Sequence, residues 1–144
     1  TAGCRAYLEA VHPEPPLMGR TPAERGRVAD LISRIEADAL GAVAECLRNT
    51  AKAMKDRALT GPLDYAQIPE LGERGRVRAQ HFFPQLDKLI GDKPYLLGDA
   101  LTAADIDAFI FVGFVKWIKV EVPADCGNVA RWVEAMSLRP SAAL

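Results

Sequence analysis

The sequence predicts an all-α fold, a helical bundle around one buried central helix. Apolar residues recur every three or four positions over long segments, which is the spacing of one helix face. No segment alternates apolar and polar residues for long enough to form a strand. Residues 106–117 are apolar around the whole helical circumference, so this helix should be covered on most sides. The 144 residues are the length of one ordinary domain.

The chain opens with a short helical segment and a linker. Residues 1–10 have the pattern of the end of a helix. The prolines at positions 13, 15 and 16 stop this helix, because proline lacks an amide donor and restricts the residue before it. Residues 11–20 are therefore expected to form a linker.

The first long helix is expected to begin at Thr21. Thr21 can cap the helix, Pro22 suits the first helical position, and Glu24 can complete a capping box. Apolar residues at helical spacing continue to about Lys55, and a bend is expected near Gly41.

Three further helices are expected after a break at residues 60–65, which contain glycine and proline. A second long helix covers residues 69–90, although two glycines weaken its first turns. A third helix covers residues 103–117. A fourth covers residues 127–138, where an Arg-Pro pair ends it.

The third helix is expected to start with a capping box and a hydrophobic staple. The Thr102 hydroxyl can accept from the Asp105 backbone N–H, and the Asp105 carboxylate can reach back to the Thr102 N–H. Leu101 and Ile106 flank the box at the positions of a staple. Because the helix is buried, its first amides need protein partners rather than water.

A pair of acid–base carboxylates is the alternative interpretation of this start. Asp105 and Asp107 lie two residues apart, about 200° around a helix, so they cannot act on one substrate from one face. Asp107 is expected either near water at the helix start or hydrogen-bonded to a neighbour, because an unpaired buried charge is costly. Trp117 and Trp132 are expected in the core, and His81 on a helix face rather than as a base.

Composition argues against several classes of function. The net charge of −1 and the pI of about 6.1 leave no basic excess for nucleic acid. Cys4, Cys46 and Cys126 are an odd and widely spaced set, which disfavours disulfides, and with only His12 and His81 the chain offers little for a metal site. The apolar run is too short for a bilayer, which needs about 20 residues, and no signal-peptide pattern opens the chain. We therefore expect a cytoplasmic protein without membrane, nucleic-acid or metal partners.

The residues around the capping box carry a family resemblance. The nine residues from Gly98 to Ile106, GDALTAADI, resemble the G-D-x-[ILF]-[ST]-x-A-D-I signature of the C-terminal domain of cytosolic glutathione S-transferases. In that family the segment is the capping box and staple of the central helix. Residues 67–71 and 74–75 are similar to a bacterial branch of the family. The resemblance extends over nearly the whole chain, and the other matching segments are residues 7–17, 21–25, 128–132 and 139–140.

The resemblance implies a two-domain protein of which this chain holds mainly the second domain. Residues 1–10 would be the end of the last helix of a thioredoxin-like domain, residues 11–20 the interdomain linker, and residues 21–144 the all-α C-terminal domain. In the family, the thioredoxin-like domain, mostly missing from this chain, binds glutathione and supplies the residue that activates its thiol. The helical domain supplies an apolar pocket for the electrophile and part of a homodimer surface.

Few site residues can be assigned from the resemblance. By register with Tyr7, Thr1 would take the place of the family serine that holds the γ-glutamyl carboxylate of glutathione. Arg48, Lys52 and Tyr65 are substrate-binding candidates, because they flank the end of the first long helix and the loop after it. The alternatives are surface solvation of the two cations and loop packing of the tyrosine. No catalytic residue and no metal ligand is expected in this chain.

The implied function is the helical half, for electrophile binding and dimerisation, of a transferase. Such an enzyme conjugates or reduces small hydrophobic electrophiles with glutathione as co-substrate. Because the thiol-activating residue belongs to the other domain, the 144 residues alone are expected to be inactive. The alternative is a non-catalytic protein–protein interaction module built on the same fold.

Overall fold

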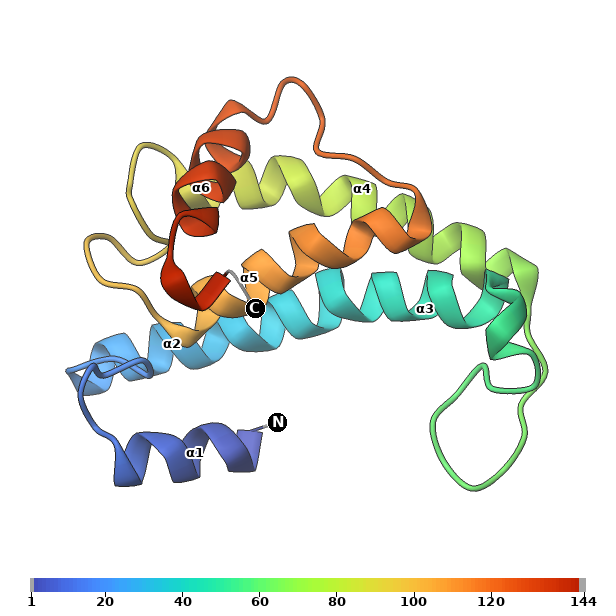
Figure 1. Cartoon of the computed structure of the whole chain (residues 1–144), viewed down its shortest axis with the longest axis horizontal. Helices are drawn as coiled ribbons and strands as arrows, with labels where there is room; N and C mark the ends of the chain where they lie inside the picture. The colour runs from blue at the N-terminus through green and yellow to red at the C-terminus, as the bar shows by residue number, and fades with distance from the viewer. Residues whose placement is uncertain (1, 143–144) are drawn as a thin grey trace.

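All regular structure in the described part of the chain is helical, which confirms the predicted fold class (Figure 1). The computed structural model describes residues 2–142. Within that range, no helix is both long and apolar enough to cross a membrane. The α-helices are α1 (Ala2–Val11), α2 (Pro22–Arg34), α3 (Gly41–Thr50), α4 (Pro69–Ile90), α5 (Ala103–Phe114) and α6 (Gly127–Ser137).

The first long helix is one rod made of α2, the π-helical segment η1 (Ile35–Leu40) and α3 (Figure 1). The Gly41 N–H donates to the Glu36 carbonyl, five residues back, so the irregularity expected near Gly41 is a π-helical turn. The rod ends at Thr50 rather than at Lys55, and residues 52–54 form a separate 3₁₀ turn.

The start of the rod is capped largely as the sequence indicates. Thr21 Oγ1 accepts from the Glu24 N–H at 3.2 Å, and Pro22 occupies the first helical position. The Glu24 carboxylate accepts from the Arg20 N–H at 2.8 Å, one residue before the amide that a capping box predicts.

Two glycines bring α4 close to α3. A Cβ added at Gly75 would lie 2.6 Å from both the Ala42 carbonyl oxygen and the Cys46 nitrogen. A Cβ added at Gly72 would clash with the side chain of Thr50. These glycines lower the helix propensity of the first turns of α4, but they allow the two backbones to approach more closely than any side chain would permit.

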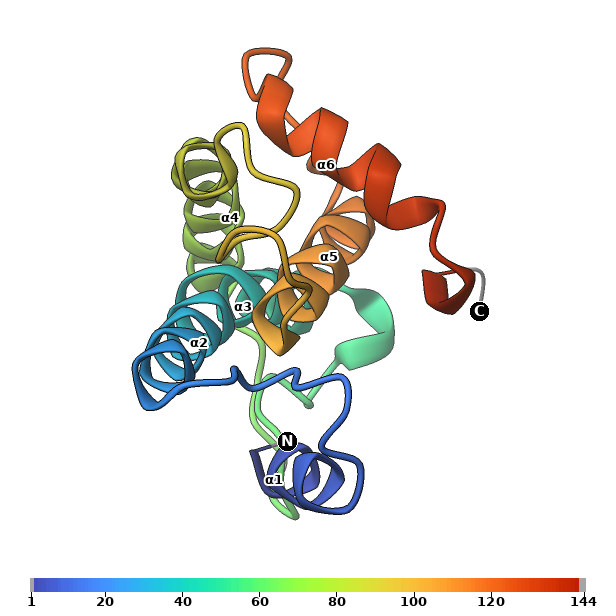
Figure 2. The same ribbon diagram turned by 90° about the vertical axis from the view of Figure 1, so that its left-hand side faces the viewer.

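The core surrounds α5, which lies between the α2–α3 rod, α4 and α6 (Figure 2). Phe111 of α5 is fully buried, with ring centroids 5.4 Å and 5.2 Å from those of Phe82 and Phe83 on α4. Trp132 of α6 is also fully buried and packs edge-on against Phe109 at 6.2 Å, which confirms its predicted place in the core.

One side of α5 is open, and the prediction that Trp117 belongs to the core is wrong. Trp117 is 61% exposed, in the 3₁₀ turn Val115–Ile118 that follows α5. Ile106, Ile110 and Phe114, spaced four residues apart on the same helix, are each 38% exposed. The helix is apolar on all sides, whereas its neighbours cover only the sides that face the rod, α4 and α6.

The start of α5 is a capping box that also reaches the loop before it. Asp105 Oδ2 accepts from the Thr102 N–H at 2.9 Å and from the Thr102 hydroxyl at 2.8 Å. Asp105 Oδ1 accepts from the Leu96 N–H at 2.8 Å. Burial raises the pKa of Asp105, and the hydrogen bonds oppose this rise. Leu101 is half-buried and Ile106 partly exposed, and their contact as a staple stays a prediction.

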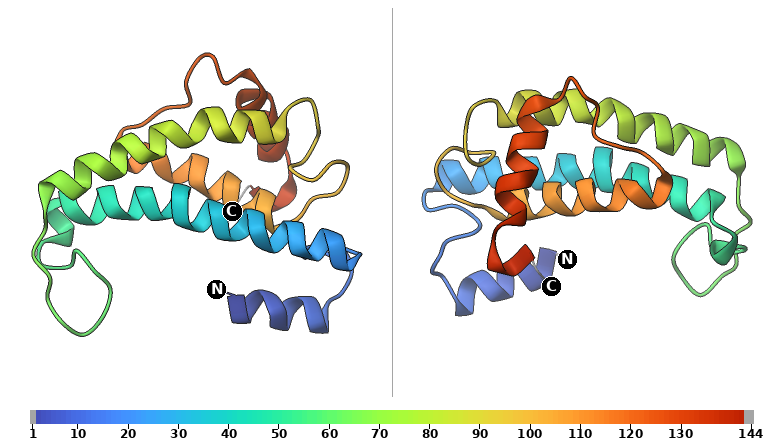
Figure 3. Two further views of the ribbon diagram at one scale, coloured as in Figure 1. Left: turned by 180° about the vertical axis from the view of Figure 1, so that it is seen from behind. Right: turned by 45° about the horizontal axis from the view of Figure 1, so that its top comes forward.

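The helix α1 lies outside the bundle, and none of its residues is buried (Figure 3). The Glu9 carboxylate accepts from the N–H groups of Leu17 and Met18 at 3.2 Å and 3.1 Å. The Leu17 carbonyl in turn accepts from the Ala103 N–H at 2.9 Å. The linker is therefore fastened both to α1 and to the first turn of α5.

Candidate functional site

A groove lies between α3 and the open side of α5, with a volume of about 320 Å³. We call it the α3–α5 groove. Ile110, Phe114 and Trp117 form the wall on the side of α5. The opposite wall comes from the long rod, with Arg48 near its end, and from Met54 of the 3₁₀ turn that follows. The apolar residues of the rod in this wall are Leu40, Val43, Ala44 and Leu47.

The α5 wall presents a pair of stacked aromatic rings. The ring centroids of Phe114 and Trp117 are 4.4 Å apart, and the ring planes differ by only 17°. Because Trp117 is 61% exposed, a large flat apolar surface faces the groove instead of the core. Rings of this kind offer wide contact area to a flat apolar molecule.

Arg48 is the one charged residue among the described residues that line the groove. Its Nη1 donates to the Arg57 carbonyl at 3.1 Å. Within residues 2–142, Arg48 forms no ion pair, whereas Arg74 and Arg78 both pair with Glu45. The guanidinium therefore brings an uncompensated positive charge to an apolar site.

The backbone around Arg48 is held by side chains from the far side of the loop. Gln67 Nε2 donates to the carbonyls of Arg48 and Ala51 at 2.7 Å and 2.9 Å. Asn49 Oδ1 accepts from the Ile68 N–H at 2.9 Å. The Gln67 side chain thus satisfies the Arg48 carbonyl in the last turn of α3, and the three bonds together tie this turn to residues 67 and 68.

The structure does not bring the predicted site residues together in the groove. Arg48 lines the groove. Lys52 is exposed on the 3₁₀ turn, and Tyr65 is 42% exposed in the loop, where its backbone pairs with Ala58 and Asp56. Neither Lys52 nor Tyr65 contributes to the groove lining. Thr1 lies outside the described residues.

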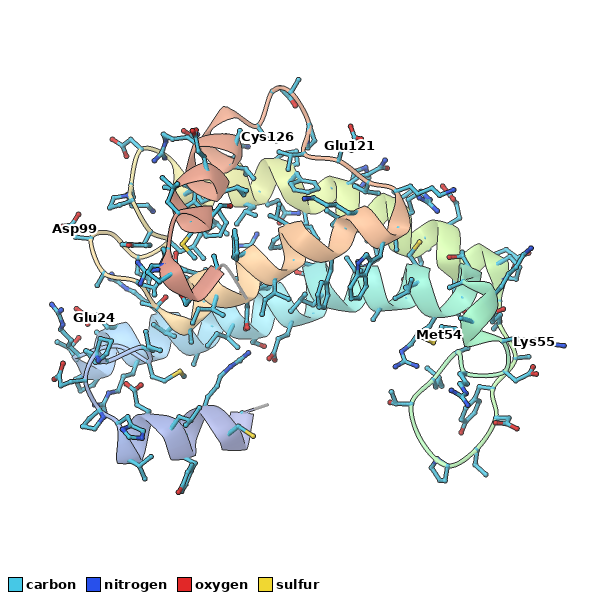
Figure 4. All side chains as sticks on the ribbon, in the orientation of Figure 1. Glu24, Met54, Lys55, Asp99, Glu121 and Cys126 are labelled. Atoms are coloured by element: carbon cyan, nitrogen blue, oxygen red, sulfur yellow. The ribbon has the colours of Figure 1, made fainter. Side chains whose placement is uncertain are left out.

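Sequence reasoning missed Phe114 and Trp117 as site residues, because both fit the spacing of core positions. In Figure 4, Met54 lies below the end of α3, while Lys55 points away from the bundle. Met54 lies just before Lys55, the expected end of the apolar pattern, and carries no signal of its own. Only the placement of neighbouring helices distinguishes an aromatic residue of the groove from one of the core.

A second cavity of about 400 Å³ lies between α1, the linker and α5. Three of its charged side chains, Arg5, Glu9 and Asp107, already have partners. Arg5 Nη2 donates to both carboxylate oxygens of Asp107, at 2.6 Å and 2.8 Å, and Glu9 accepts from backbone amides. Burial raises the pKa of Asp107, and Arg5 opposes this rise. We therefore regard this cavity as part of the attachment of α1.

The two aspartates of α5 do not meet at one site. Asp105 bonds to Thr102 and Leu96, whereas Asp107 bonds to Arg5. The geometry does not support an acid–base pair. Among residues 2–142, no three His, Cys, Asp or Glu side chains are gathered as a metal site would require.

A family model and a curated protein that match this chain are both described as glutathione S-transferases. The family model for "Glutathione S-transferase, C-terminal domain" matches residues 53–140. Glutathione S-transferase 2 of Saccharomyces cerevisiae is 29% identical over 136 residues, which cover 94% of this chain and 56% of that protein. The chain thus spans little more than half the length of this curated relative.

Solved structures show the same relationship. The crystal structure of Gtt2 from Saccharomyces cerevisiae superposes with a TM-score of 0.85 at 28% identity, covering 96% of this chain and 64% of that one. A Gtt2-class glutathione S-transferase of Vibrio parahaemolyticus gives a TM-score of 0.78 at 30% identity, covering 98% of this chain and 63% of that one. Both matches include α1 and the linker, since almost the whole chain is covered.

Proposed function

The chain belongs to the glutathione S-transferase C-terminal domain family, and from this premise we propose that it is the helical half of a glutathione-dependent transferase. In this proposal the α3–α5 groove binds the small hydrophobic electrophile. Glutathione is the co-substrate, bound and activated by the thioredoxin-like domain that the family resemblance implies.

The observation that carries the proposal is the open apolar side of α5. Four large apolar residues of α5 and the 3₁₀ turn after it remain accessible: Ile106, Ile110, Phe114 and Trp117. A soluble domain seldom leaves such a stripe open unless it binds something. A groove of about 320 Å³ is at the lower end of the range for small-molecule sites, about 300–1,000 Å³.

The position of α1 supports the same proposal. Both α1 and the loop at residues 55–68 project on one side of the bundle (Figures 1 and 3). If α1 is the last helix of a thioredoxin-like domain, that domain lies on this side. Ile110 lines both the α3–α5 groove and the cavity under α1, so the two sites share a wall.

The proposed reaction joins the sulfur of glutathione to the electrophilic carbon of the acceptor. With an aryl chloride, a carbon–sulfur bond forms, the carbon–chlorine bond breaks, chloride leaves and the thiol proton passes to water. The thiolate is the nucleophile, and lowering the thiol pKa is the role of the other domain. Arg48 is proposed to bind substrate in the groove, while Thr1, Lys52 and Tyr65 stay predictions. We also propose a cytoplasmic homodimer.

The test compares the chain alone with a two-domain protein. The 144-residue chain, mixed with glutathione and 1-chloro-2,4-dinitrobenzene, is expected to give no turnover above buffer. The thioredoxin-like half of the Saccharomyces cerevisiae relative, joined ahead of residue 1, should restore turnover. Trp117→Ala should then lower kcat/KM about tenfold, as expected for the loss of one large apolar contact.

Two outcomes would contradict the proposal. One is turnover by the 144-residue chain alone. The other is a folded chimera that binds to immobilised glutathione but turns over no acceptor in a panel of aryl halides, epoxides and peroxides. The second outcome would favour the non-catalytic interaction module.

A further inference from the structure

We propose that the α3–α5 groove selects planar aromatic ligands that carry an anionic group, a carboxylate or sulfonate, which Arg48 binds. This inference rests on the proposed function, because it names the class of acceptor for the same site. Neutral and cationic aromatic molecules of the same size are expected to bind more weakly.

The planar part of the ligand is indicated by the walls of the groove. Phe114 and Trp117 stack with ring centroids 4.4 Å apart and ring planes that differ by 17°, so the uncovered outer face of the stack is flat. The opposite wall is largely aliphatic and comes mainly from the long rod, with Leu40 and Leu47 among its residues. A flat ring system can stack on such an aromatic face, which a branched aliphatic chain cannot do.

The anionic part of the ligand is indicated by the positive charge of Arg48 in the α3–α5 groove. Arg48 is half-buried, lines the groove and forms no ion pair within the described residues. Within the described residues, its side-chain hydrogen bond to the Arg57 carbonyl uses Nη1 and leaves other N–H donors of the guanidinium for a ligand. A guanidinium can bind a carboxylate or sulfonate through two parallel hydrogen bonds.

The nearby acidic residue does not cancel this charge. Glu45 lies one helical turn before Arg48 on α3, but its carboxylate pairs with Arg74 and Arg78 of α4. These two arginines hold Glu45 on the α4 side of the helix. Apolar walls reduce the screening of Arg48 by water, which strengthens its attraction for an anion and its repulsion of a cation.

The experiment uses three ligands with the same ring system and different charge. Naphthalene-2-sulfonate is anionic, naphthalene-2-methanol is neutral, and 2-naphthylmethylammonium is cationic. Calorimetric titration of the 144-residue chain measures each affinity without glutathione. The anion is expected to bind at least about tenfold more tightly than the neutral ligand, and the cation most weakly.

The two tryptophans locate the binding. The indole N–H signal of Trp117, assigned with Trp117→Phe, should shift in two-dimensional ¹H–¹⁵N spectra. The signal of Trp132, which is fully buried in the core, should stay in place. Binding that shifts only Trp132, or neither signal, would place the ligand elsewhere and overturn the inference.

Substitution of Arg48 tests the selectivity. Arg48→Gln should remove the preference, so that the anion and the neutral ligand bind within about twofold of each other, and Arg48→Lys should keep part of the preference. Arg27→Gln, which removes an exposed arginine of α2, is the matched control and should bind as the parent does. Circular dichroism confirms that each variant is folded. An anion preference that survives in Arg48→Gln would overturn the inference.

The two proposals can fail separately. In the two-domain chimera, 4-chloro-3,5-dinitrobenzoate should be preferred over 1-chloro-2,4-dinitrobenzene, and Arg48→Gln should reverse this order. Turnover without that preference leaves the proposed function standing and overturns the acceptor class. Selective binding by the chain without turnover by the chimera leaves the anionic-ligand site standing and contradicts the transferase.

Discussion

Arg5 Nη2 lies 2.6 Å and 2.8 Å from the two carboxylate oxygens of Asp107, and this contact joins residues 102 positions apart in the sequence. Arg5 Nη1 also lies 3.0 Å from Glu36 Oε1. Because α1 has no buried residue, these polar contacts and those of Glu9 attach it to the bundle. Asp107, which the sequence leaves without a partner, is thus the point where α1 meets α5.

Arg5→Gln should detach α1 while the bundle stays folded. Hydrogen bonds to charged groups contribute about 1.5–3 kcal/mol each, so we expect the free energy of local opening of α1 to fall by about 1–3 kcal/mol. Amide hydrogen exchange measured by mass spectrometry should show faster exchange in residues 2–11 and unchanged exchange in α4. The control, Arg27→Gln, should leave both unchanged. Faster exchange throughout the bundle would show that α1 supports the core instead.

Asp105→Ala should destabilise the whole domain, because three donors lose their acceptor together. The cap by itself is worth about 0.5–2 kcal/mol. The Leu96 N–H becomes a buried donor without a partner, which adds about 1–3 kcal/mol. We expect a loss of about 2–4 kcal/mol in the free energy of unfolding, measured with urea and circular dichroism. Asp99→Ala, at an exposed position of the preceding loop, should change it by less than about 0.5 kcal/mol.

Gly75→Ala should be strongly destabilising although alanine is the better helix former. The added methyl group would lie 2.6 Å from two backbone atoms of α3, so α3 and α4 must move apart. Overpacking of this kind costs about 1–3 kcal/mol. Gly26→Ala, in α2 with nothing within 4 Å of the added Cβ, should instead stabilise by up to about 1 kcal/mol. The two variants should therefore shift the thermal midpoint in opposite directions. If both variants raised the thermal midpoint by the same amount, helix propensity alone would decide the effect and the close approach of α3 and α4 would not matter.

Helix positions could be predicted because they depend on local patterns. The bounds of α4 agree with the expected 69–90, and α6 ends one residue before the expected 138. The capping box at Thr102 and Asp105 lies where the T-x-x-D spacing indicates. These features depend on residues three or four positions apart, whose relationship is present in the sequence itself.

Relationships between distant segments could not be predicted in the same way. Trp117 and Trp132 have the same apolar spacing, yet one is 61% exposed and the other fully buried. The difference depends on which helix packs beside each ring. Likewise, nothing near Asp107 in the sequence points to Arg5, since the pairing depends on where the linker places α1.

The stability of the domain in acid should depend on Glu45. Hydrogen bonding from Arg74 lowers the pKa of Glu45 in the folded protein, and Arg78 adds to this effect while burial opposes it. The folded-state pKa therefore lies below the ordinary glutamate value of about 4.3. The ionised carboxylate stabilises the fold above that value, and this contribution is lost as the pH falls through the folded-state pKa.

Glu45→Gln should accordingly be less stable than the parent at pH 7, and the two proteins should converge as the pH falls below about 4. Urea unfolding at pH 7, 5, 4 and 3 measures the difference at each step. A double-mutant cycle with Arg74→Gln isolates the pair, and its coupling energy should disappear over the same interval because a protonated Glu45 no longer attracts the guanidinium. A difference between Glu45→Gln and the parent that stays constant from pH 7 to pH 3 would mean that glutamine disturbs packing between α3 and α4 rather than charge.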